Sequence, residues 1–380
     1  MAYAVKRAGG FAGYYRDAQG RRCSAGVFPT EAEAIIRARD LEGAPVAVRR
    51  AASATYAEHF EDWLTDVRGI SPRTLIGYEH EIRRNVLPLV GHRPVASMTQ
   101  RTVRDMVDAL LGQGAGPHTV LQCKSALGRS LRPLVPDVLA SNPCHGVKVA
   151  VPPSTTFSVM SPDDFQRVVA YLSQGFALFA SVLVSTGARF GEAAEIRAGD
   201  INARTGECTI SRRVVSVNGR TGDGSRFAVI AGTKSGSNRG RTVGLPPGLA
   251  ADVAGWIEAH RIGSGDLVFP SRLMRRHSPS APRRGRGSNT TGHLANDHWR
   301  DIWYAACDAS GIGWRPRPHD LRHSYATYLV ASGVSIYEVQ VLMGHSLIST
   351  TLGYLHRVEA MRSKAVEVAG VFTMRKPEVG

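Results

Sequence analysis

The side chains best suited to chemistry lie close to the C-terminal end of the chain. His319, Arg322, His345 and Tyr354 supply two imidazoles, a guanidinium and a phenol within one short stretch. His319 and Arg322 stand at positions i and i+3, so on a helix they share one face. This set suits a phosphodiester, because the cationic and imidazole groups can hold the non-bridging oxygens while the phenol attacks phosphorus.

Short helices are expected to present these groups, at about 320–332, 335–343 and 349–356. Serine or aspartate begins each helix and glycine follows the first two, which are the residue types that favour helix N-caps and C-caps. Tyr354 falls in the third helix, from which it could pack toward the same point as the histidines.

The preceding part of the chain contains further charged candidates. Residues 157–365 are predicted to form one mainly helical domain with a small antiparallel sheet. Arg189 and Glu192 follow an apolar helix that ends at Gly187. Three strands are expected, at 208–210, 227–230 and 242–245. Lys234 lies in the Gly/Ser-rich turn between the last two strands.

Six positions, in their order and spacing, resemble those of the tyrosine recombinase (phage integrase) family. They are Arg189, Lys234, His319, Arg322, His345 and Tyr354. The motifs that carry the resemblance are Thr186-Gly-Ala-Arg189-Phe-Gly-Glu192, His319-Asp-Leu-Arg322-His-Ser324, Leu342-Met-Gly-His345 and Thr351-Leu-Gly-Tyr354. The resemblance covers residues from about 160 to 360. Each residue alone has an ordinary structural explanation, and their joint occurrence in a strongly basic chain favours the recombinase.

The resemblance implies a role for each of these side chains. Tyr354 would attack a DNA phosphate, giving a 3′-phosphotyrosine and a free 5′-hydroxyl, and a neutral His319 would take the proton of the phenol. Arg189 and Arg322 would hold the non-bridging oxygens, which fixed guanidinium groups do well. Lys234 would protonate the leaving 5′-oxygen.

His345 would donate a further hydrogen bond to the phosphate, and Glu192 would orient an arginine or a histidine. The phosphotyrosine conserves the bond energy, so no ATP or other cofactor is expected, and with this many cationic donors no metal is required. His319 and His323, at i and i+4, could instead chelate a metal. Zinc sites of that kind carry Glu after the first histidine, where this chain has Asp320.

Residues 1–50 are predicted to form a small unit of three short strands followed by a helix. Its basic side chains are Lys6, Arg7, Arg16, Arg21 and Arg22. A basic ribbon of this size fits a DNA major groove, and an ordinary solvated face is the alternative. The strand and helix order resembles the arm-type DNA-binding domain of phage and integrative-element integrases.

Residues 54–145 are predicted to form a compact helical bundle, because apolar residues recur at helical spacing and the connections are short. The bundle resembles the core-binding (SAM-like) domain of the same family. Arg83, Arg84, Lys124 and Arg129 are candidates for a DNA-facing side, although charged solvent faces are usual in any bundle. Residues 146–156 are expected to be a linker.

The composition points to the same class of partner. The 380 residues have a formal net charge of +15 and a pI of about 10.0, which favours nucleic acid over a membrane surface as the partner. Five scattered cysteines favour reduced thiols and argue against a disulfide framework or a CxxC zinc site. No apolar run is long enough to span a bilayer and no signal peptide is evident, so we expect a cytoplasmic protein associated with the bacterial nucleoid.

Two segments are expected to lie outside the packed domains. Residues 271–288 contain six arginines and no acid, which predicts a mobile loop that touches phosphate or stays disordered. Residues 366–380 are expected to be a C-terminal tail, and apolar residues of 357–380 could pack onto a neighbouring protomer.

The expected protein is multidomain and mainly α, with small antiparallel sheets (α+β). We expect a site-specific DNA recombinase, a phage or integrative-element integrase, acting as a homotetramer on double-stranded attachment sites. A directionality factor or a DNA-bending host protein would be a further partner. Two alternatives are a type IB topoisomerase-like relaxase, and a catalytically silent DNA-binding regulator derived from a recombinase.

Overall fold

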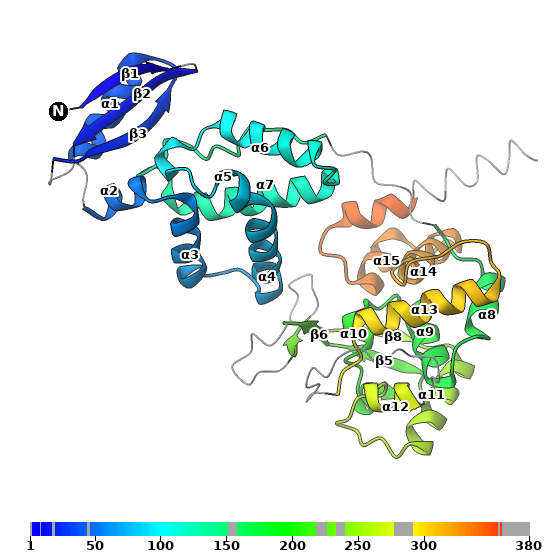
Figure 1. Cartoon of the computed structure of the whole chain (residues 1–380). Helices are drawn as coiled ribbons and strands as arrows, with labels where there is room; N and C mark the ends of the chain where they lie inside the picture. The colour runs from blue at the N-terminus through cyan, green and yellow to red at the C-terminus, as the bar shows by residue number, and fades with distance from the viewer. Residues whose placement is uncertain are drawn as a thin grey trace, which may run out of the picture. The chain divides into compact units, whose positions relative to one another are not determined.

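The chain folds into two compact units, residues 1–155 and 156–380, and each is described by itself. The computed structural model describes residues 2–7, 9–16, 20–43, 46–150, 158–217, 226–232, 240–276, 292–355 and 358. Figure 1 colours the first unit blue to cyan-green and the second green to orange-red. The boundary between the units falls in the predicted linker 146–156. Across the described residues, no helix is both long and apolar enough to cross a membrane.

The first unit begins with a three-stranded antiparallel sheet and a helix, as predicted. The strands β1 (Tyr3–Arg7), β2 (Gly10–Arg16) and β3 (Arg22–Phe28) pair in that order, and α1 (Glu31–Gly43) packs against them. Gly13 permits this packing, because a Cβ at that position would lie 2.4 Å from the Ala34 carbonyl oxygen of α1. Tyr15 is fully buried in the same core.

The rest of the first unit is a helical bundle, also as predicted (Figure 1). Its helices are α2 (Val46–Ser53), α3 (Tyr56–Asp66), α4 (Pro72–Glu81), a π-helical turn η1 (Ile82–Val86), α5 (Leu87–Val90), the 3-10 turn η2 (Val95–Ser97), α6 (Gln100–Gly112), α7 (Pro117–Leu131) and the 3-10 turn η3 (Arg132–Leu134). Ser71 and Thr99 cap α4 and α6, because each side chain accepts a hydrogen bond from the backbone three residues on. Neither α2 nor the π turn was expected from the sequence.

The sheet and the bundle share one hydrophobic core. Tyr15 and Leu41 belong to the same buried cluster as Phe60 of the bundle. Gly26 of β3 approaches the bundle so closely that a Cβ would lie 2.3 Å from the Ala96 carbonyl oxygen. The first unit therefore contains both of the expected domains, 1–50 and 54–145, and their division into two domains stays a prediction.

The second unit is built from helices around two small sheets. Its elements are α8 (Pro162–Val169), α9 (Gln174–Thr186), α10 (Phe190–Ala193), η4 (Ala198–Asp200), β4 (Ile201–Asn202), β5 (Glu207–Ile210), β6 (Arg212–Ser216), β7 (Phe227–Ala231), β8 (Arg241–Gly244), α11 (Pro247–Ala259), α12 (Ser271–Arg276), α13 (Asn296–Ser310), α14 (Asp320–Ala331), α15 (Ile336–Met343) and a helical segment at 348–355. Trp256, Trp299, Trp303 and Phe179 are fully buried and form the centre of its core. The whole chain is mainly helical with small antiparallel sheets, which confirms the expected fold class.

The expectation of a single sheet in this unit was wrong. β8 pairs with β5 in a three-stranded sheet of order β4-β5-β8, whereas β7 pairs with β6 in a separate two-stranded sheet. β6 was not expected from the sequence, because Arg-Arg-Val-Val-Ser does not alternate between polar and apolar residues. The segment with Lys234 therefore connects two sheets rather than the strands of one hairpin, and Lys234 itself lies outside the described residues.

The Arg-rich segment was also only partly predicted. Its first residues form α12 (Ser271–Arg276), in which Met274 is fully buried in the core, so this part is not a loop. The remainder of 271–288 lies outside the described residues, as does the tail 366–380.

The last three helices form a smaller hydrophobic cluster that includes Tyr354. Ala326 of α14 and Val339 and Met343 of α15 belong to it, and Val358 extends it beyond the helical segment 348–355. α14 also packs against α9, which connects this cluster to the rest of the unit. The predicted helix positions near the C-terminal end are confirmed to within a few residues.

Candidate active site

One buried carboxylate holds two arginines in place at the start of the site. Arg189 precedes α10, and its backbone nitrogen and Nη1 donate to the two carboxylate oxygens of Glu192 at 3.0 and 2.8 Å. Arg241 of β8 donates from Nη2 to Glu192 Oε2 at 2.8 Å. Burial alone would raise the pKa of Glu192, but the charges and hydrogen bonds of Arg241 and Arg189 outweigh it and lower the pKa to about 2.

The turn after α9 brings Arg189 close to a second buried guanidinium. Gly187 ends α9 in the left-handed conformation, with φ of 60°. Its carbonyl oxygen accepts a hydrogen bond from Arg322 Nη1, and the carbonyl oxygen of Met343, the last residue of α15, accepts one from Arg322 Nη2. Two helix C-termini thus fix the Arg322 side chain, and the partial negative charge of helix ends favours the cation there.

Arg322 is 2% exposed. Its burial, followed by repulsion from Arg189, lowers its pKa to about 9, so the guanidinium remains charged at neutral pH. The carboxylate of Glu192 opposes this effect. The site therefore contains a permanent cation whose orientation is set by backbone groups.

The two predicted histidines are neutral at neutral pH. His319, at the start of α14, is accessible to solvent, yet desolvation by the surrounding protein and the neighbouring His323, Arg322 and Arg189 lower its pKa to about 4. Burial and then Arg322 and Arg189 lower the pKa of His345 to about 4 as well. A neutral imidazole can accept a proton at one nitrogen and donate a hydrogen bond from the other, and both properties are useful at a phosphate.

Tyr354 lies against the histidines of this cluster. It is 3% exposed, and its hydroxyl lies 2.8 Å from Nδ1 of His323. Its ring stacks on that of His345, with centroids 6.2 Å apart and planes at 3°. Burial raises the pKa of Tyr354, and the charges of Arg322 and Arg189 lower it in part.

The cluster opens to solvent beside His319. A cavity of about 300 Å³ is lined there by Phe190, Asn296, Arg300, Tyr304, Arg317 and His319. Arg317 is paired with Asp320 at 2.8 Å, so its charge is partly compensated. The opening gives His319 direct access to an external ligand.

The second unit thus brings together Arg189, Glu192, His319, Arg322, His345 and Tyr354, which the sequence analysis selected. It also contains three contacts that were not selected: Arg241 on Glu192, His323 on Tyr354, and Thr351 Oγ1 at 2.9 Å from His345 Nδ1. His323 follows Arg322 directly, and this spacing was the signal that could have identified it. In the parts of the chain that are described, no three His, Cys, Asp or Glu side chains are grouped to hold a metal.

The basic residues predicted to contact DNA from the sheet are all exposed. These are Lys6, Arg7, Arg16, Arg21 and Arg22. The Arg22 guanidinium lies 4.9 Å from the centre of the Tyr14 ring, which in turn stacks on Tyr3 with centroids 5.6 Å apart. Arg16 is opposite Arg22 in the strand register, so these two charges share one face of the sheet.

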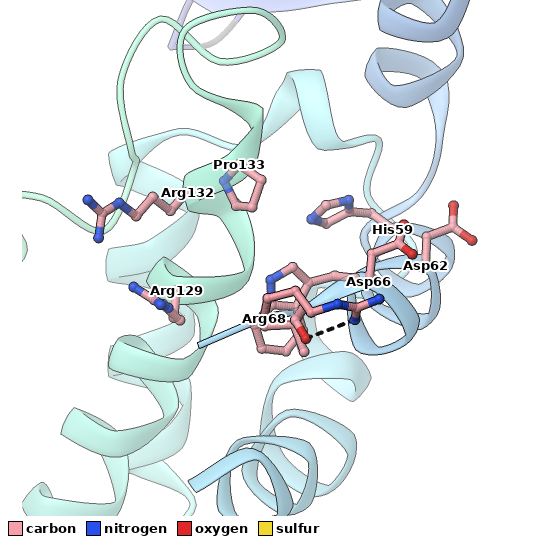
Figure 2. Close-up of a pocket in the computed structure, with 9 residues that line it drawn as sticks. His59, Asp62, Asp66, Arg68, Arg129, Arg132 and Pro133 are labelled. Atoms are coloured by element: carbon pink, nitrogen blue, oxygen red, sulfur yellow. Dashed lines mark hydrogen bonds between the residues drawn. The ribbon is translucent and has the colours of Figure 1, made fainter. Parts of the chain in front are cut away.

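The four candidates on the bundle differ from one another. Arg83 forms hydrogen bonds with Glu61 and Glu79, and Lys124 donates to the Val147 carbonyl oxygen at 2.6 Å. Arg84 is exposed. Arg129 lines a pocket of about 740 Å³ between α3 and the end of α7, shown in Figure 2.

The pocket beside Arg129 has mixed charge. Arg129, Arg132 and Arg68 line it together with Asp62 and Asp66. Trp63 is a further lining residue and adds apolar surface. Two carboxylates facing three guanidinium groups leave little net attraction for a polyanion. The pocket is therefore less suited to phosphate than the exposed basic face of the sheet.

The fold is similar to that of integrases whose structures have been solved with DNA. The chain is similar to the Tn1549 transposon integrase, solved in complex with transposon right end DNA, with a TM-score of 0.63 and 17% identity over 79% of this chain and 94% of that one. It is also similar to lambda integrase, solved as a tetramer bound to a Holliday junction, with a TM-score of 0.54 and 18% identity over 92% of this chain and 94% of that one.

The sequence places the chain in a family. Residues 159–361, more than half of the chain, match the phage integrase family, and the protein belongs to that family. An integrase/recombinase of Escherichia coli is 28% identical over 218 residues, a match that covers 52% of this chain and 59% of that protein. The chain thus spans less than two thirds of the length of this relative.

Proposed function

We propose that the protein is a site-specific DNA recombinase of the integrase type, which cuts and rejoins DNA strands through a 3′-phosphotyrosine at Tyr354. The observation that carries this proposal is the cluster itself. A tyrosine hydroxyl, two guanidinium groups and neutral imidazoles meet in a domain of the phage integrase family. The similarity to integrases solved on DNA and the net charge of +15 support DNA as the substrate.

Arg189 and Arg322 would hold the non-bridging oxygens of the scissile phosphate. Arg322 is fixed by two backbone carbonyls, so it can offset charge that develops on phosphorus without reorganising. Arg189 is held at one end by Glu192 and its side chain is 23% exposed, which leaves it able to reach a ligand. Glu192 would then act by orienting Arg189, and His345 would donate a hydrogen bond to the phosphate.

Proton transfers complete the reaction. One imidazole of the site would take the proton of Tyr354 as its oxygen bonds to phosphorus, and Lys234 would give a proton to the 5′-oxygen as it leaves. The phosphotyrosine conserves the energy of the broken bond, so rejoining by a 5′-hydroxyl needs no ATP. This assignment requires no cofactor.

The assembly on DNA would be a homotetramer on two paired attachment sites. Support for this comes from the lambda integrase structure, a tetramer bound to a Holliday junction. The exposed basic face of the N-terminal sheet would contact DNA as an arm-type domain, and the bundle would contact the core site. A directionality factor or a DNA-bending host protein would set the direction, and the reaction would take place at the bacterial nucleoid.

The test compares the native protein with Tyr354→Phe on candidate recombination sites. These sites are DNA repeats that flank the gene. Duplexes that contain these repeats are nicked at successive positions. When a nick lies close to the cleavage site, cleavage releases a short DNA fragment, and the covalent protein–DNA complex is trapped because the strand cannot be rejoined. The native protein should form an adduct at one position, and Tyr354→Phe should bind the same DNA without forming any. An adduct that persists in Tyr354→Phe would remove Tyr354 from its role.

The adduct assay and a plasmid-relaxation assay separate the two alternatives. A regulator without catalytic activity would bind the repeats and form no adduct with the native protein. A topoisomerase-like relaxase would relax supercoiled plasmids that lack the repeats, whereas the proposed recombinase should act on plasmids that contain them.

A further inference from the structure

The hydroxyl of Tyr354 is in hydrogen-bond contact with a histidine outside the six-residue set. Nδ1 of His323 lies 2.8 Å from Tyr354 Oη, well within the range of a short O–H···N hydrogen bond. His323 is half-buried in the first turn of α14, and the two ring centroids are 5.8 Å apart. The contact joins α14 directly to the helical segment 348–355.

Three side chains at the start of α14, those of its N-cap His319 and of Arg322 and His323 in its first turn, make different contacts. Arg322 reaches the carbonyl oxygens of Gly187 and Met343. His319 lines the cavity that opens beside it and is itself exposed to solvent. His323 packs edge to face against His319, with centroids 4.8 Å apart, and its Nδ1 meets Tyr354.

We propose that His323 is the group that accepts the proton of Tyr354, an assignment that rests on the proposed function. In cleavage, the phenolic O–H bond breaks and its proton passes to His323 Nδ1, while Tyr354 Oη bonds to phosphorus. The bond from phosphorus to the 5′-oxygen breaks, and that oxygen takes a proton from Lys234. In rejoining, the 5′-hydroxyl returns its proton to Lys234, the phosphotyrosine bond breaks, and His323 returns its proton to the phenolate.

Direct contact matters because Tyr354 is 3% exposed, so bulk water has little access to its hydroxyl. Burial also raises the pKa of the phenol, which makes loss of its proton harder without an adjacent acceptor. His319 is then free to bind the phosphate from the solvent-accessible side. The sequence-based assignment of the acceptor to His319 changes accordingly.

Two substitutions distinguish proton acceptance from simple positioning. In His323→Asn the amide stands close to the place of Nδ1, so it can keep a hydrogen bond to Tyr354 but cannot take a proton. Loss of a general base should slow single-turnover cleavage by about 10²–10⁴-fold, while DNA affinity and the unfolding midpoint stay close to those of the native protein. The control is His260→Asn, at the C-cap of α11 and outside the site, which should cleave at the native rate.

A more acidic nucleophile provides the decisive readout. When 3,5-difluorotyrosine replaces Tyr354, the phenol loses its proton more readily. This replacement should therefore restore much of the cleavage rate of His323→Asn, but not that of His319→Asn. A substrate with sulfur at the bridging 5′ position needs no proton on its leaving group. That substrate should not restore His323→Asn, because the defect lies at the nucleophile.

The possible results distinguish a failure of the His323 assignment from a failure of the proposed recombinase function. If His323→Asn cleaves at the native rate, or if difluorotyrosine restores His319→Asn instead, His323 is not the acceptor while the recombinase function stands. If the sulfur substrate restores His323→Asn, His323 serves the leaving group and the inference is wrong. If the native protein forms no adduct at Tyr354, the proposed function fails first.

Discussion

At the scale of single residues, the site is organised by side chains that bind one another as much as by those that would bind DNA. Glu192 is 1% exposed and bridges Arg189 and Arg241. Two further donor atoms of Arg241, Nε and Nη1, are buried without a hydrogen-bond partner among the described residues. Glu192 is therefore the carboxylate that compensates the charge of Arg241 in the core, and it shares this role with Arg189.

Glu192→Gln should destabilise the protein in a pH-dependent way. The pKa of Glu192 is lowered from 4.5 to about 2, a shift that corresponds to roughly 3 kcal/mol of stabilisation at neutral pH. Because the folded pKa is lowered, this stabilisation is present above about pH 4.5 and is lost as pH falls toward 2. Urea unfolding followed by tryptophan fluorescence should show a large difference at pH 7 and a smaller one at pH 3. An equal difference at both pH values would show that charge is not the cause.

The hydroxyl of Thr351 should determine which ring nitrogen of His345 carries the proton. Thr351 is fully buried, and its Oγ1 lies 2.9 Å from His345 Nδ1. If the hydroxyl donates to Nδ1, the proton of the neutral imidazole stays on Nε2, where it can donate to phosphate. Thr351→Val should lower single-turnover cleavage by about tenfold, the value of one hydrogen bond. Thr351→Ser keeps the hydroxyl and should cleave at close to the native rate, so an equal loss in both variants would exclude this role.

At the scale of elements, helix ends determine where the site residues lie, and the sequence predicted most of them. Serine caps and glycine ends follow local chemistry, so Ser335, Gly187 and Gly344 are found where they were expected. Strand pairing depends on distant partners, and missing β6 was enough to make the predicted sheet wrong. His323 and Arg241 were not selected because their roles depend on which side chains the fold brings to them.

Gly187→Ala should be strongly destabilising and should also disturb the site. Gly187 has φ of 60°, and a Cβ there would lie 2.4 Å from Tyr325 Cδ1. The left-handed conformation alone costs an alanine about 1–2 kcal/mol, and the clash adds to this cost. The Gly187 carbonyl holds Arg322, so cleavage should fall along with the unfolding free energy.

The matched control is Gly255→Ala in the middle of α11 of the same unit. A Cβ at Gly255 meets nothing within 4 Å and the backbone is helical, so alanine should stabilise the protein by up to about 1 kcal/mol. Denaturant unfolding measures both changes. A small effect of Gly187→Ala would mean that the turn after α9 adapts without cost.

At the scale of the whole molecule, the net charge of +15 does not identify which lysine and arginine side chains contact DNA. A guanidinium that is already paired with carboxylates adds little to attraction for phosphate, because its charge is compensated inside the protein. Arg83 and Arg84 are neighbours in the η1 turn, and both are exposed. Arg83 is bound by Glu61 and Glu79, whereas no carboxylate in the described parts of the chain is paired with Arg84.

This pair of neighbours gives a direct test of how the basic charge is used. Each phosphate contact contributes about 0.9 to the slope of log affinity against log salt concentration. Arg84→Gln should reduce the slope by about 1, if Arg84 contacts one phosphate, and should weaken binding at low salt. Arg83→Gln should leave the slope nearly unchanged, because its charge is compensated by Glu61 and Glu79 in the free protein. Affinities measured by fluorescence anisotropy between low and moderate salt would decide the matter. An equal loss of slope in both variants would mean that DNA displaces those carboxylates, and that the ion pairs of the free protein do not predict its DNA-binding surface.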